Sequence, residues 1–457
     1  MNKLLLLLLL APLLLAPARA AADNQPAATL DPEFMGMVIR DPWYEAGGDP
    51  TKPTQVNTTF LDSEGRELAN LGVRWVRLDV QIVVPPETPS DKVLGLVQAE
   101  LAKNDYFINV VAPRHSLKVL ALLSFDLLKG SAYPSALNSS ASVASRFGGG
   151  VNAYMDTWLT RALLVADRYG SNIAAYEVLN EQNRLTKPQI DPEPKNTSMK
   201  EGDGIAPAIL GRLITKFYRF CRGIDVPADE QSHGCKDASI IMGGLHPRGS
   251  SFRGNQPTDA VYLSEVYNDA ASFKGFYDLY GRWPLDGIGY HPYPEEIRQS
   301  RPADVYVDEG IERIRAALEN APRNDGGENA ACTPMWITEV GYNVGQVVNR
   351  VTQTESGQAA FLQDIYTSLA GLRVCGSQVA VPHIFWFKYE DFPPASGVNA
   401  QRWGLVRIPF TTGPCPGGEC YAVDGVPAER RQAYLTYREL AGLPIQRISL
   451  PIIANNR

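Results

Sequence analysis

The chain has 457 residues, of which 44% are hydrophobic and 20% are charged, and its formal net charge is −7 at pH 7. This length is enough for one large domain or two ordinary ones, with a substantial hydrophobic core. The mild acidity offers no basic face for counterion release, so we expect neither nucleic acid nor an anionic membrane surface as a partner.

The N-terminus has the pattern of a secretory signal peptide. Lys3 precedes an apolar run from Leu4 to about Leu15, and Ala18-Arg19-Ala20 then resembles a cleavage site. The run is shorter than the roughly 18 residues that a membrane span needs. We therefore predict a signal peptide over residues 1–22, export to the extracellular space or the periplasm, no membrane attachment after cleavage, and one domain over residues 23–457.

Short apolar segments rich in β-branched residues recur along the rest of the chain and predict strands. In chain order they are Phe34 to Ile39, Val73 to Val80, Leu117 to Phe125, Ile173 to Asn180, Ser239 to Leu245, Leu285 to His291, Pro334 to Val340 and Val381 to Phe387.

Segments with helical spacing of apolar residues lie between these strands, and another follows the last one. They begin near Ala153, Ile209, Asp304, Ser356 and Ala428. Near-continuous apolar strands that alternate with amphipathic helices indicate a parallel sheet covered by helices. Eight such units predict an α/β fold of the (β/α)8 TIM-barrel type with long insertions in the βα loops. An open doubly wound sheet is the alternative, but no glycine-rich nucleotide-binding motif follows an early strand.

The six cysteines are an even number in a chain that we expect to be exported, which favours disulfide bonds. The pairs closest in sequence are Cys221–Cys235 and Cys415–Cys420, which leaves Cys332–Cys375 as the third. Other pairings and free buried thiols stay open. A zinc site is not expected, because no C-x-x-C motif and no histidine cluster accompanies the cysteines.

Polar residues gather at the ends of the predicted strands, and in a barrel these ends form the functional face. They are Arg77, Asn180, Glu181, His291, Tyr293, Glu339 and Trp386. Burying charged groups without partners is costly, so a barrel that had only to be stable would have little reason to place them there.

Two carboxylates on opposite sides of a small site are what cleavage of a glycosidic bond requires. One must be protonated to assist the leaving oxygen, and the other must be ionised to attack the anomeric carbon or activate water. Arg77 beside Glu339 would keep that glutamate ionised, while Glu181 would hold the proton.

The segments "YEVLNEQN", "WITEVGY", "HPYP" and "WVRLD" resemble the strand-end signatures of clan A glycoside hydrolases, the retaining (β/α)8 enzymes such as families 5 and 39. The resemblance covers essentially the whole mature chain, and its specificity lies in the combination of motifs. The usual Asn-Glu-Pro is Asn-Glu-Gln here, and strand three lacks the histidine that many family 5 members have, which puts assignment to that family in doubt.

This resemblance implies a role for each strand-end residue. It implies that Glu181 is the acid/base, that Asn180 binds a sugar hydroxyl, and that Glu339 is the nucleophile. It also implies that Arg77 contacts the nucleophile, that His291 and Tyr293 line the subsite of the reacting sugar, and that Trp386 is the aromatic platform under the sugar.

Several other residues admit two interpretations. Glu177 could compete for the acid role, but its position deeper in the strand favours a brace for Arg77. Asp79 and His246 either bind substrate or only begin loops. The aromatic residues Trp43, Tyr389 and Trp403 either extend the cleft or pack, and Trp336 is expected in the core.

The sequence therefore predicts an exported retaining glycoside hydrolase that cleaves β-glycosidic bonds of an oligo- or polysaccharide through a covalent glycosyl-enzyme. We expect a carbohydrate as its binding partner, a monomer, and no metal or organic cofactor. The alternatives are a transglycosylase that uses the same site and a carbohydrate-binding barrel that has lost turnover; a metal-dependent barrel hydrolase is more remote.

Overall fold

A computed structural model of the chain describes residues 29–39, 56–129, 137–183, 204–247, 259–293, 303–348, 351–392, 401–412 and 419–444. The predicted signal peptide, Trp43, Cys415 and nearly all of the insertion after the fourth strand lie outside these ranges. Among the described residues, no helix is both long enough and apolar enough to cross a membrane.

Eight parallel strands close into a barrel in the order β1-β12-β7-β6-β5-β4-β3-β2, which confirms the predicted (β/α)8 fold. The strands are β1 (Met35–Val38), β2 (Trp75–Asp79), β3 (Lys118–Leu123), β4 (Ala175–Val178), β5 (Ser239–Leu245), β6 (Gly287–Tyr290), β7 (Met335–Gly341) and β12 (Ile384–Phe387). Each strand lies inside a segment that the sequence predicts, except that β7 ends one residue beyond its predicted segment. Strands buried on both faces have an apolar pattern that does not depend on the loops between them.

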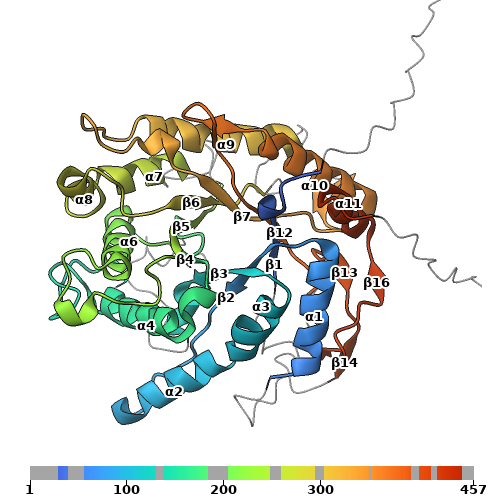
Figure 1. The fold of residues 1–457 in the computed structure, drawn as a ribbon, viewed down its shortest axis with the longest axis horizontal. Coiled ribbons are helices and arrows are strands. Elements are labelled where there is room, and N and C mark those ends of the chain that lie inside the picture. The colour runs from blue at the N-terminus through green and yellow to red at the C-terminus, as the bar shows by residue number, and fades with distance from the viewer. Residues whose placement is uncertain are drawn as a thin grey trace, which may run out of the picture.

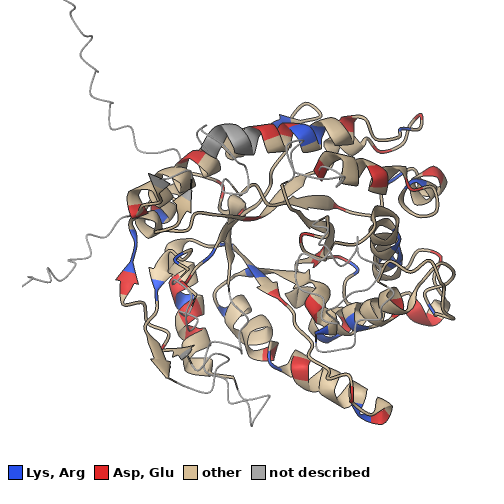
Figure 2. Ribbon diagram, turned by 180° about the vertical axis from the view of Figure 1, so that it is seen from behind, with Lys and Arg blue, Asp and Glu red and all other residues tan. Residues whose placement is uncertain are grey.

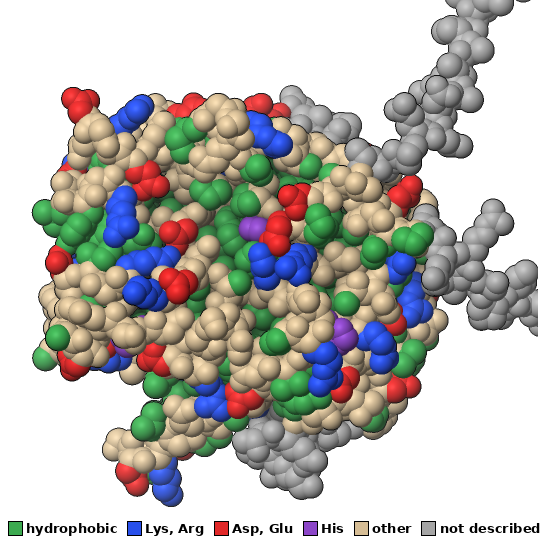
Figure 3. All heavy atoms as spheres, in the orientation of Figure 1, with side chains coloured by type: hydrophobic (Ala, Val, Ile, Leu, Met, Phe, Trp, Pro, Cys, Tyr) green, Lys and Arg blue, Asp and Glu red, His purple; other side chains and the backbone are tan. Residues whose placement is uncertain are grey.

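Helices surround the barrel, as Figure 1 shows. They are α1 (Thr58–Leu71), α2 (Ser90–Ala102), α3 (Ala112–Arg114), α4 (Ala153–Tyr169), α6 (Pro207–Arg222), α7 (Asp259–Asn268), α8 (Phe273–Tyr280), α9 (Ala303–Glu319), α10 (Glu355–Ala370) and α11 (Gln432–Leu440). Seen from behind, the charged residues lie mostly on these helices and the loops rather than on the strands (Figure 2). On the face in Figure 3, basic and acidic side chains are interspersed.

Helix α11 begins later than its periodicity predicts. Glu429 and Arg430 form a short strand, β16 (Glu429–Arg430), which pairs with β13 (Val406–Arg407) in the long loop after β12. The helix starts only at Gln432. Among the described residues, three further antiparallel strand pairs lie outside the barrel: β8 (Val347–Val348) with β9 (Val351–Thr352), β10 (Arg373–Val374) with β11 (Gln378–Val379), and β14 (Phe410–Thr412) with β15 (Glu419–Tyr421).

The hydrophobic core has two parts, which correspond to the two faces of the strands. The larger part fills the space between the strands and the helices. The smaller part fills the barrel interior and consists of Val38, Trp75, Leu120, Ala175, Ile241, Trp336 and Phe385. Trp336 thus lies in the core, as expected. Because side chains alternate along a strand, residues two positions further on rise from this apolar floor toward the carboxyl ends of the strands.

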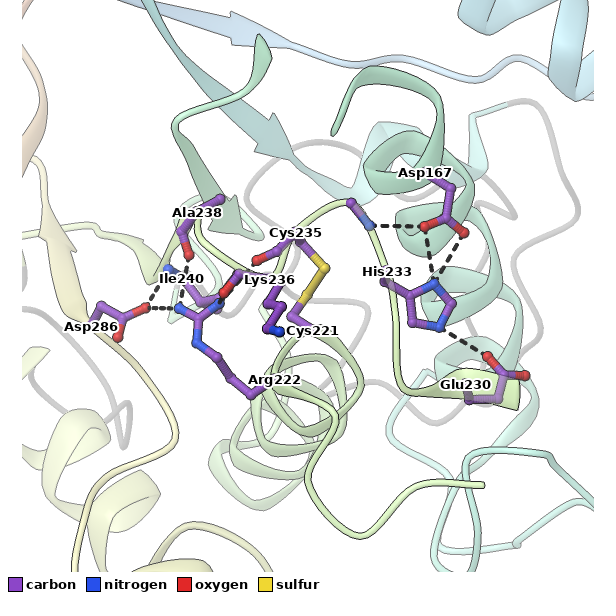
Figure 4. The surroundings of a disulfide bond; sticks show 11 residues. Asp167, Cys221, Arg222, Glu230, His233, Cys235, Lys236, Ala238, Ile240 and Asp286 are labelled. Atoms are coloured by element: carbon purple, nitrogen blue, oxygen red, sulfur yellow. Dashed lines mark hydrogen bonds and ion pairs between the residues drawn. A yellow bond between two sulfur atoms is a disulfide. The ribbon is translucent and has the colours of Figure 1, made fainter. Parts of the chain in front are cut away.

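Disulfide bonds join Cys221 to Cys235 and Cys332 to Cys375, with Cα–Cα distances of 5.1 and 5.5 Å, so two of the three predicted pairs are confirmed. Figure 4 shows the first of these. The segment that it closes is also held by His233, whose ring contacts Asp167 of α4 on one side and Glu230 on the other. The third predicted pair, Cys415–Cys420, cannot be followed because Cys415 is not described.

A buried ion pair lies just beyond β12. The Lys388 Nζ is 2.7 Å from Glu390 Oε1, and both side chains are 1% exposed. The Lys388 Nζ also lies 4.1 Å from the centre of the Phe392 ring. Glu64 of α1 is buried nearby; burial, and then the charge of Glu390, raise its pKa well above the ordinary range against the opposing charge of Lys388.

Replacing Lys388 with Met should lower the free energy of unfolding by about 3–5 kcal/mol, because Glu390 would then be a buried charge without its cation. The measurement is chemical denaturation at neutral pH. The matched control is Arg407→Ala, which breaks the ion pair between Arg407 and Glu429. The side chains of these two residues are 56% and 41% exposed, so this substitution should change stability little. A Lys388→Met variant as stable as the wild type would show that the pair is dispensable.

Candidate active site

The guanidinium of Arg77 joins three side chains at the carboxyl end of the barrel. Its Nε donates to Glu177 Oε2 at 2.5 Å, its Nη1 to Glu339 Oε1 at 2.5 Å and its Nη2 to Asn180 Oδ1 at 2.7 Å. Arg77 is 3% exposed. Burial would lower its pKa, but the charges of Glu177 and Glu339 outweigh burial and raise the pKa above its ordinary value.

Glu177 is therefore a brace rather than a competing acid. It is fully buried, and while one oxygen accepts from Arg77, the other accepts from the backbone N–H of Gly244 at 2.8 Å. Two rigid donors thus hold its carboxylate against the floor of the site. The sequence interpretation that placed Glu177 beside Arg77 agrees with these contacts.

Glu339 reaches the interior because β7 contains an irregularity. Ile337 pairs with Ile384 and Val340 with Trp386, so β7 has one more residue than β12 across this stretch. Such a bulge redirects side chains. Thr338 and Glu339 are neighbours, yet Thr338 Oγ1 contacts His291, and Glu339 contacts Arg77. The second oxygen of Glu339 accepts from Tyr293 Oη at 2.8 Å, so a donor faces each oxygen.

The backbone at the end of β4 turns sharply, which brings both Asn180 and Glu181 to the site. Leu179 and Glu181 have φ values of 66° and 46°, in the left-handed region that residues with a Cβ rarely adopt. Leu179 packs in the outer core, whereas Asn180 faces Arg77. Non-glycine residues in this conformation each cost roughly 1–3 kcal/mol, and such strain is concentrated at functional sites.

Gly243 of β5 makes room for this turn, and the next residue, Gly244, makes room for the ring of His291. A Cβ on Gly243 would lie 2.0 Å from the Leu179 carbonyl oxygen, and one on Gly244 would lie 1.9 Å from His291 Nε2. β5 also carries an extra residue relative to β6 at this point. The carbonyl of Gly244 accepts from the Glu181 N–H at 2.9 Å, which fixes the backbone of that glutamate.

His291 lies between the two candidate catalytic carboxylates. Its Nδ1 is 3.3 Å from Glu181 Oε1 and 3.8 Å from Glu339 Oε2, and its Nε2 is 2.9 Å from Thr338 Oγ1. The ring is fully buried. Burial and the charge of Arg77 would lower the pKa of His291. The charge of Glu339, together with the hydrogen bond and the charge of Glu181, outweighs them and raises the pKa above 6.5.

Trp386 does not reach the site, so its predicted role as a platform is wrong. It is fully buried in the outer core, where its ring lies 6.1 Å from that of Phe361 in α10. The alternation of β12 turns Phe385 and Phe387 inward and Trp386 outward. A one-residue change of register exchanges the two faces, and an apolar run such as "IFWF" does not show which residue faces inward.

Phe387 and Trp403 supply the aromatic surface instead. Both are partly exposed, and their ring centres are 5.5 Å apart. Tyr293, which binds Glu339, is 6.1 Å from Phe387 and 5.6 Å from Trp403. The three rings form an aromatic wall beside the carboxylate. Trp403 therefore belongs to the site. The sequence alone did not show whether this residue extends the cleft or only packs.

The remaining open positions divide between site and core. Asp79 is partly exposed at the mouth and accepts a hydrogen bond from Ser124 at 2.9 Å. His246 is buried, and its backbone forms a reciprocal pair with the Asn183 side chain. Tyr389 is fully buried in the outer core and does not extend a cleft.

No protein-family model matches the sequence, and no curated protein matches it either. Solved structures do share its fold. An aphid myrosinase is 12% identical, with a TM-score of 0.53 over 91% of this chain and 100% of that one. A β-glucosidase from Exiguobacterium marinum is 11% identical, with a TM-score of 0.50 over 90% and 98% of the two chains.

The match to a family 39 glycoside hydrolase from the gut symbiont Bacteroides cellulosilyticus WH2 is 15% identical, with a TM-score of 0.46. It covers 91% of this chain and 65% of that one, so this chain spans about two thirds of that protein's length. At 11–12% identity, the likenesses to the myrosinase and the β-glucosidase show the barrel fold alone.

The raised pKa of His291 predicts a pH-dependent contribution to stability. A histidine whose pKa is raised in the folded state stabilises fully below its unfolded pKa, and this contribution is lost as the pH rises through the folded value. The difference in unfolding free energy between wild type and His291→Gln should therefore be larger at about pH 5.5 than at about pH 9.

His115 is the matched control for this measurement. Its pKa is lowered by burial first and then by the charge of Arg114, so the difference between wild type and His115→Gln should change with pH in the opposite direction. A His291 difference that stayed constant across this range would show that folding does not shift the pKa of the imidazole.

Proposed function

We propose that this protein is an exported retaining glycoside hydrolase that cleaves β-glycosidic bonds of an oligo- or polysaccharide. One observation carries the proposal: β4 and β7 bring Glu181 and Glu339 to the same imidazole nitrogen of His291. Each glutamate is in a different environment. Glu339 faces the donors of Arg77 and Tyr293, and Glu181 faces the imidazole.

In the first step, an oxygen of Glu339 attacks the anomeric carbon while Glu181 gives its proton to the departing glycosidic oxygen. The bond from the anomeric carbon to the leaving oxygen breaks, and an ester between sugar and Glu339 forms. In the second step, Glu181 takes a proton from water, the water oxygen attacks the anomeric carbon, and the ester bond breaks. Glu339 is released as a carboxylate and Glu181 regains its proton.

The spacing of the carboxylates favours retention of configuration. The two nearest oxygens, Glu181 Oε1 and Glu339 Oε2, cannot lie further apart than the sum of their 3.3 and 3.8 Å distances from His291 Nδ1. This limit includes the roughly 5–5.5 Å spacing of retaining enzymes and leaves only the shortest part of the roughly 6.5–9.5 Å range of inverting enzymes.

The surrounding residues support binding of a sugar at this place. Arg77 holds the Asn180 Oδ1, which fixes the amide and directs its Nδ2 donors, so we assign Asn180 to a sugar hydroxyl. Phe387 and Trp403 present aromatic faces beside Glu339, and sugars place their apolar C–H faces on such rings. The two disulfides support export, because such bonds persist in oxidising compartments.

Replacing either glutamate with glutamine should slow turnover, but for a different reason in each case. With defined polysaccharides and aryl β-glycosides, Glu339→Gln should lower kcat by about 10⁴-fold or more, because no nucleophile remains. Glu181→Gln should lose less activity on a 2,4-dinitrophenyl β-glycoside, whose leaving group needs no proton, than on an unactivated substrate. Glu265→Gln, at an exposed position of α7, is the control.

Trapping with a 2-fluoro glycoside tests the covalent step separately, since an adduct on Glu339 is expected by mass spectrometry. Full activity in both glutamine variants would refute the site. No adduct from any glycoside in a broad panel would favour a barrel that only binds sugar. Transfer of the glycosyl group to an added sugar acceptor, in place of water, would indicate a transglycosylase.

Phe387→Ala and Trp386→Ala should have opposite consequences although the residues are adjacent. Phe387→Ala should raise KM roughly tenfold with little change in stability, because it removes an aromatic face from the sugar. Trp386→Ala should lower the free energy of unfolding by about 3–5 kcal/mol, because it leaves a cavity in the outer core. Steady-state kinetics and denaturation of both variants provide the comparison, and the reverse pattern would restore Trp386 as the platform.

A further inference from the structure

We propose that the carboxylate of Asp79, held by Ser124, binds a hydroxyl group of the reacting sugar and selects among sugars that differ at that hydroxyl. This inference rests on the proposed glycoside hydrolase function and adds a specificity determinant to it. Asp79 and Ser124 come from the ends of β2 and β3, and neither takes part in the bond-breaking chemistry described above.

The alternation of β2 places Asp79 over the reacting groups. Trp75 lies on the floor of the barrel interior, Arg77 rises above it to bind Glu339, and Asp79 is the next residue on that face. At about 3.3 Å per residue, Asp79 starts roughly 6.6 Å further toward the mouth than Arg77. A sugar ring bound at Glu339 occupies the layer above Arg77, which is the layer that Asp79 borders.

The order of the strands sets the direction in which Asp79 faces the sugar. In the closed barrel, β2 lies across from β6 and β3 lies across from β7. Tyr293 follows β6 and Glu339 is on β7, so Asp79 and Ser124 form the opposite rim of the site. A ring whose anomeric carbon is at Glu339 has its other carbons directed away from that residue, so a hydroxyl on the far side of the ring can face this rim.

Ser124 is a rigid anchor for the carboxylate. It is 2% exposed, and its hydroxyl donates to Asp79 Oδ1 at 2.9 Å. Ser124 is also the N-cap of η3 (Phe125–Leu128), where its Oγ accepts a hydrogen bond from the Asp126 N–H at 3.0 Å. The Ser124 carbonyl accepts from the indole of Trp158 in α4 at 3.3 Å. These contacts fix the orientation of Asp79 before substrate binds, which reduces the entropy cost of binding a hydroxyl.

A carboxylate suits a hydroxyl group better than a neutral acceptor does. Hydrogen bonds from hydroxyl donors to charged acceptors are shorter and about twice as strong as neutral ones. A site that hydrogen-bonds a substrate hydroxyl binds an analogue lacking that hydroxyl more weakly, because the hydrogen bond is lost. Asp79 can therefore distinguish sugars by the presence and orientation of one hydroxyl.

The test pairs Asp79→Ala with substrates that lack single hydroxyls. The parent is the 2,4-dinitrophenyl β-glycoside that the wild type hydrolyses fastest, compared with its 3-, 4- and 6-deoxy forms. On the parent, Asp79→Ala should lower kcat/KM roughly 10- to 100-fold. On the one analogue that lacks the contacted hydroxyl, the same substitution should change kcat/KM by less than about threefold, because the interaction is already absent.

A merely structural role for Asp79 gives a different pattern, in which the loss is equal on all four sugars. That result, or no loss on the parent, would overturn the proposal. Ser124→Ala should reproduce the pattern of Asp79→Ala more weakly, because it removes one hydrogen bond that orients the carboxylate and leaves the carboxylate in place. Asp278→Ala, at an exposed position on α8 paired with Lys274, is the matched control and should leave every rate unchanged.

Failure of the proposed function can be recognised separately. If the wild type hydrolyses no glycoside, the same comparison is made by calorimetric binding of the methyl β-glycosides and their deoxy forms to wild type and Asp79→Ala. If Asp79→Ala weakened binding only of the sugars that carry the contacted hydroxyl, Asp79 would have its proposed role in a protein that binds sugar without cleaving it. Equal binding by both proteins, or no binding by either, would reject it.

Discussion

The site depends on the burial of one arginine. Arg77 is almost inaccessible to water, and its guanidinium donates to Glu177, Glu339 and Asn180 at once. The fork of donors is planar and rigid, so it fixes the relative positions of three side chains from two further strands. Removing one partner would leave buried charge uncompensated. The nucleophile that we propose is thus held by the same interaction that keeps the interior of the barrel electrostatically satisfied.

Around this arginine, the backbone departs from regular strand geometry where function requires it. A bulge in β7 turns Glu339 inward, and two left-handed residues turn the end of β4. In β5, Gly243 accommodates that turn and Gly244 accommodates the ring of His291. These irregularities are mutually dependent, because Gly244 contacts the backbone of Glu181, the carboxylate of Glu177 and the ring of His291. Strain of this kind persists only where neighbouring structure over-determines it.

Buried ion pairs stabilise the segments that carry the aromatic wall. Phe387 precedes Lys388, whose ammonium is paired with Glu390, and the segment continues to Asp391, which binds Arg431 at 2.5 and 2.8 Å. Gly404, directly after Trp403, donates to Asp391 at 3.0 Å. Because such pairs are costly when broken, they hold residues 388–391 and Gly404 in place. The apolar face for a sugar therefore does not depend on the rings alone.

The sequence by itself determined the barrel, the strand segments and most of the charged residues at their ends. Eight apolar segments separated by amphipathic helices have few other ways to bury their surface, and Arg77, Glu181, His291 and Glu339 stand at the ends of four of them. Two disulfide pairings and the bracing role of Glu177 also followed from position in the chain.

Only the tertiary structure decided which neighbours face inward. In "IFWF" every residue is apolar, so the inward turn of Phe387 and the outward turn of Trp386 depend on the register of β12 against β7 and β1. Likewise, the bulge that admits Glu339 arises from pairing with another strand and leaves no local signal in "WITEVGY". Trp403 joined the site through a contact with Tyr293 from a distant segment. Register and long-range packing are properties of pairs of segments, and a single segment does not contain them.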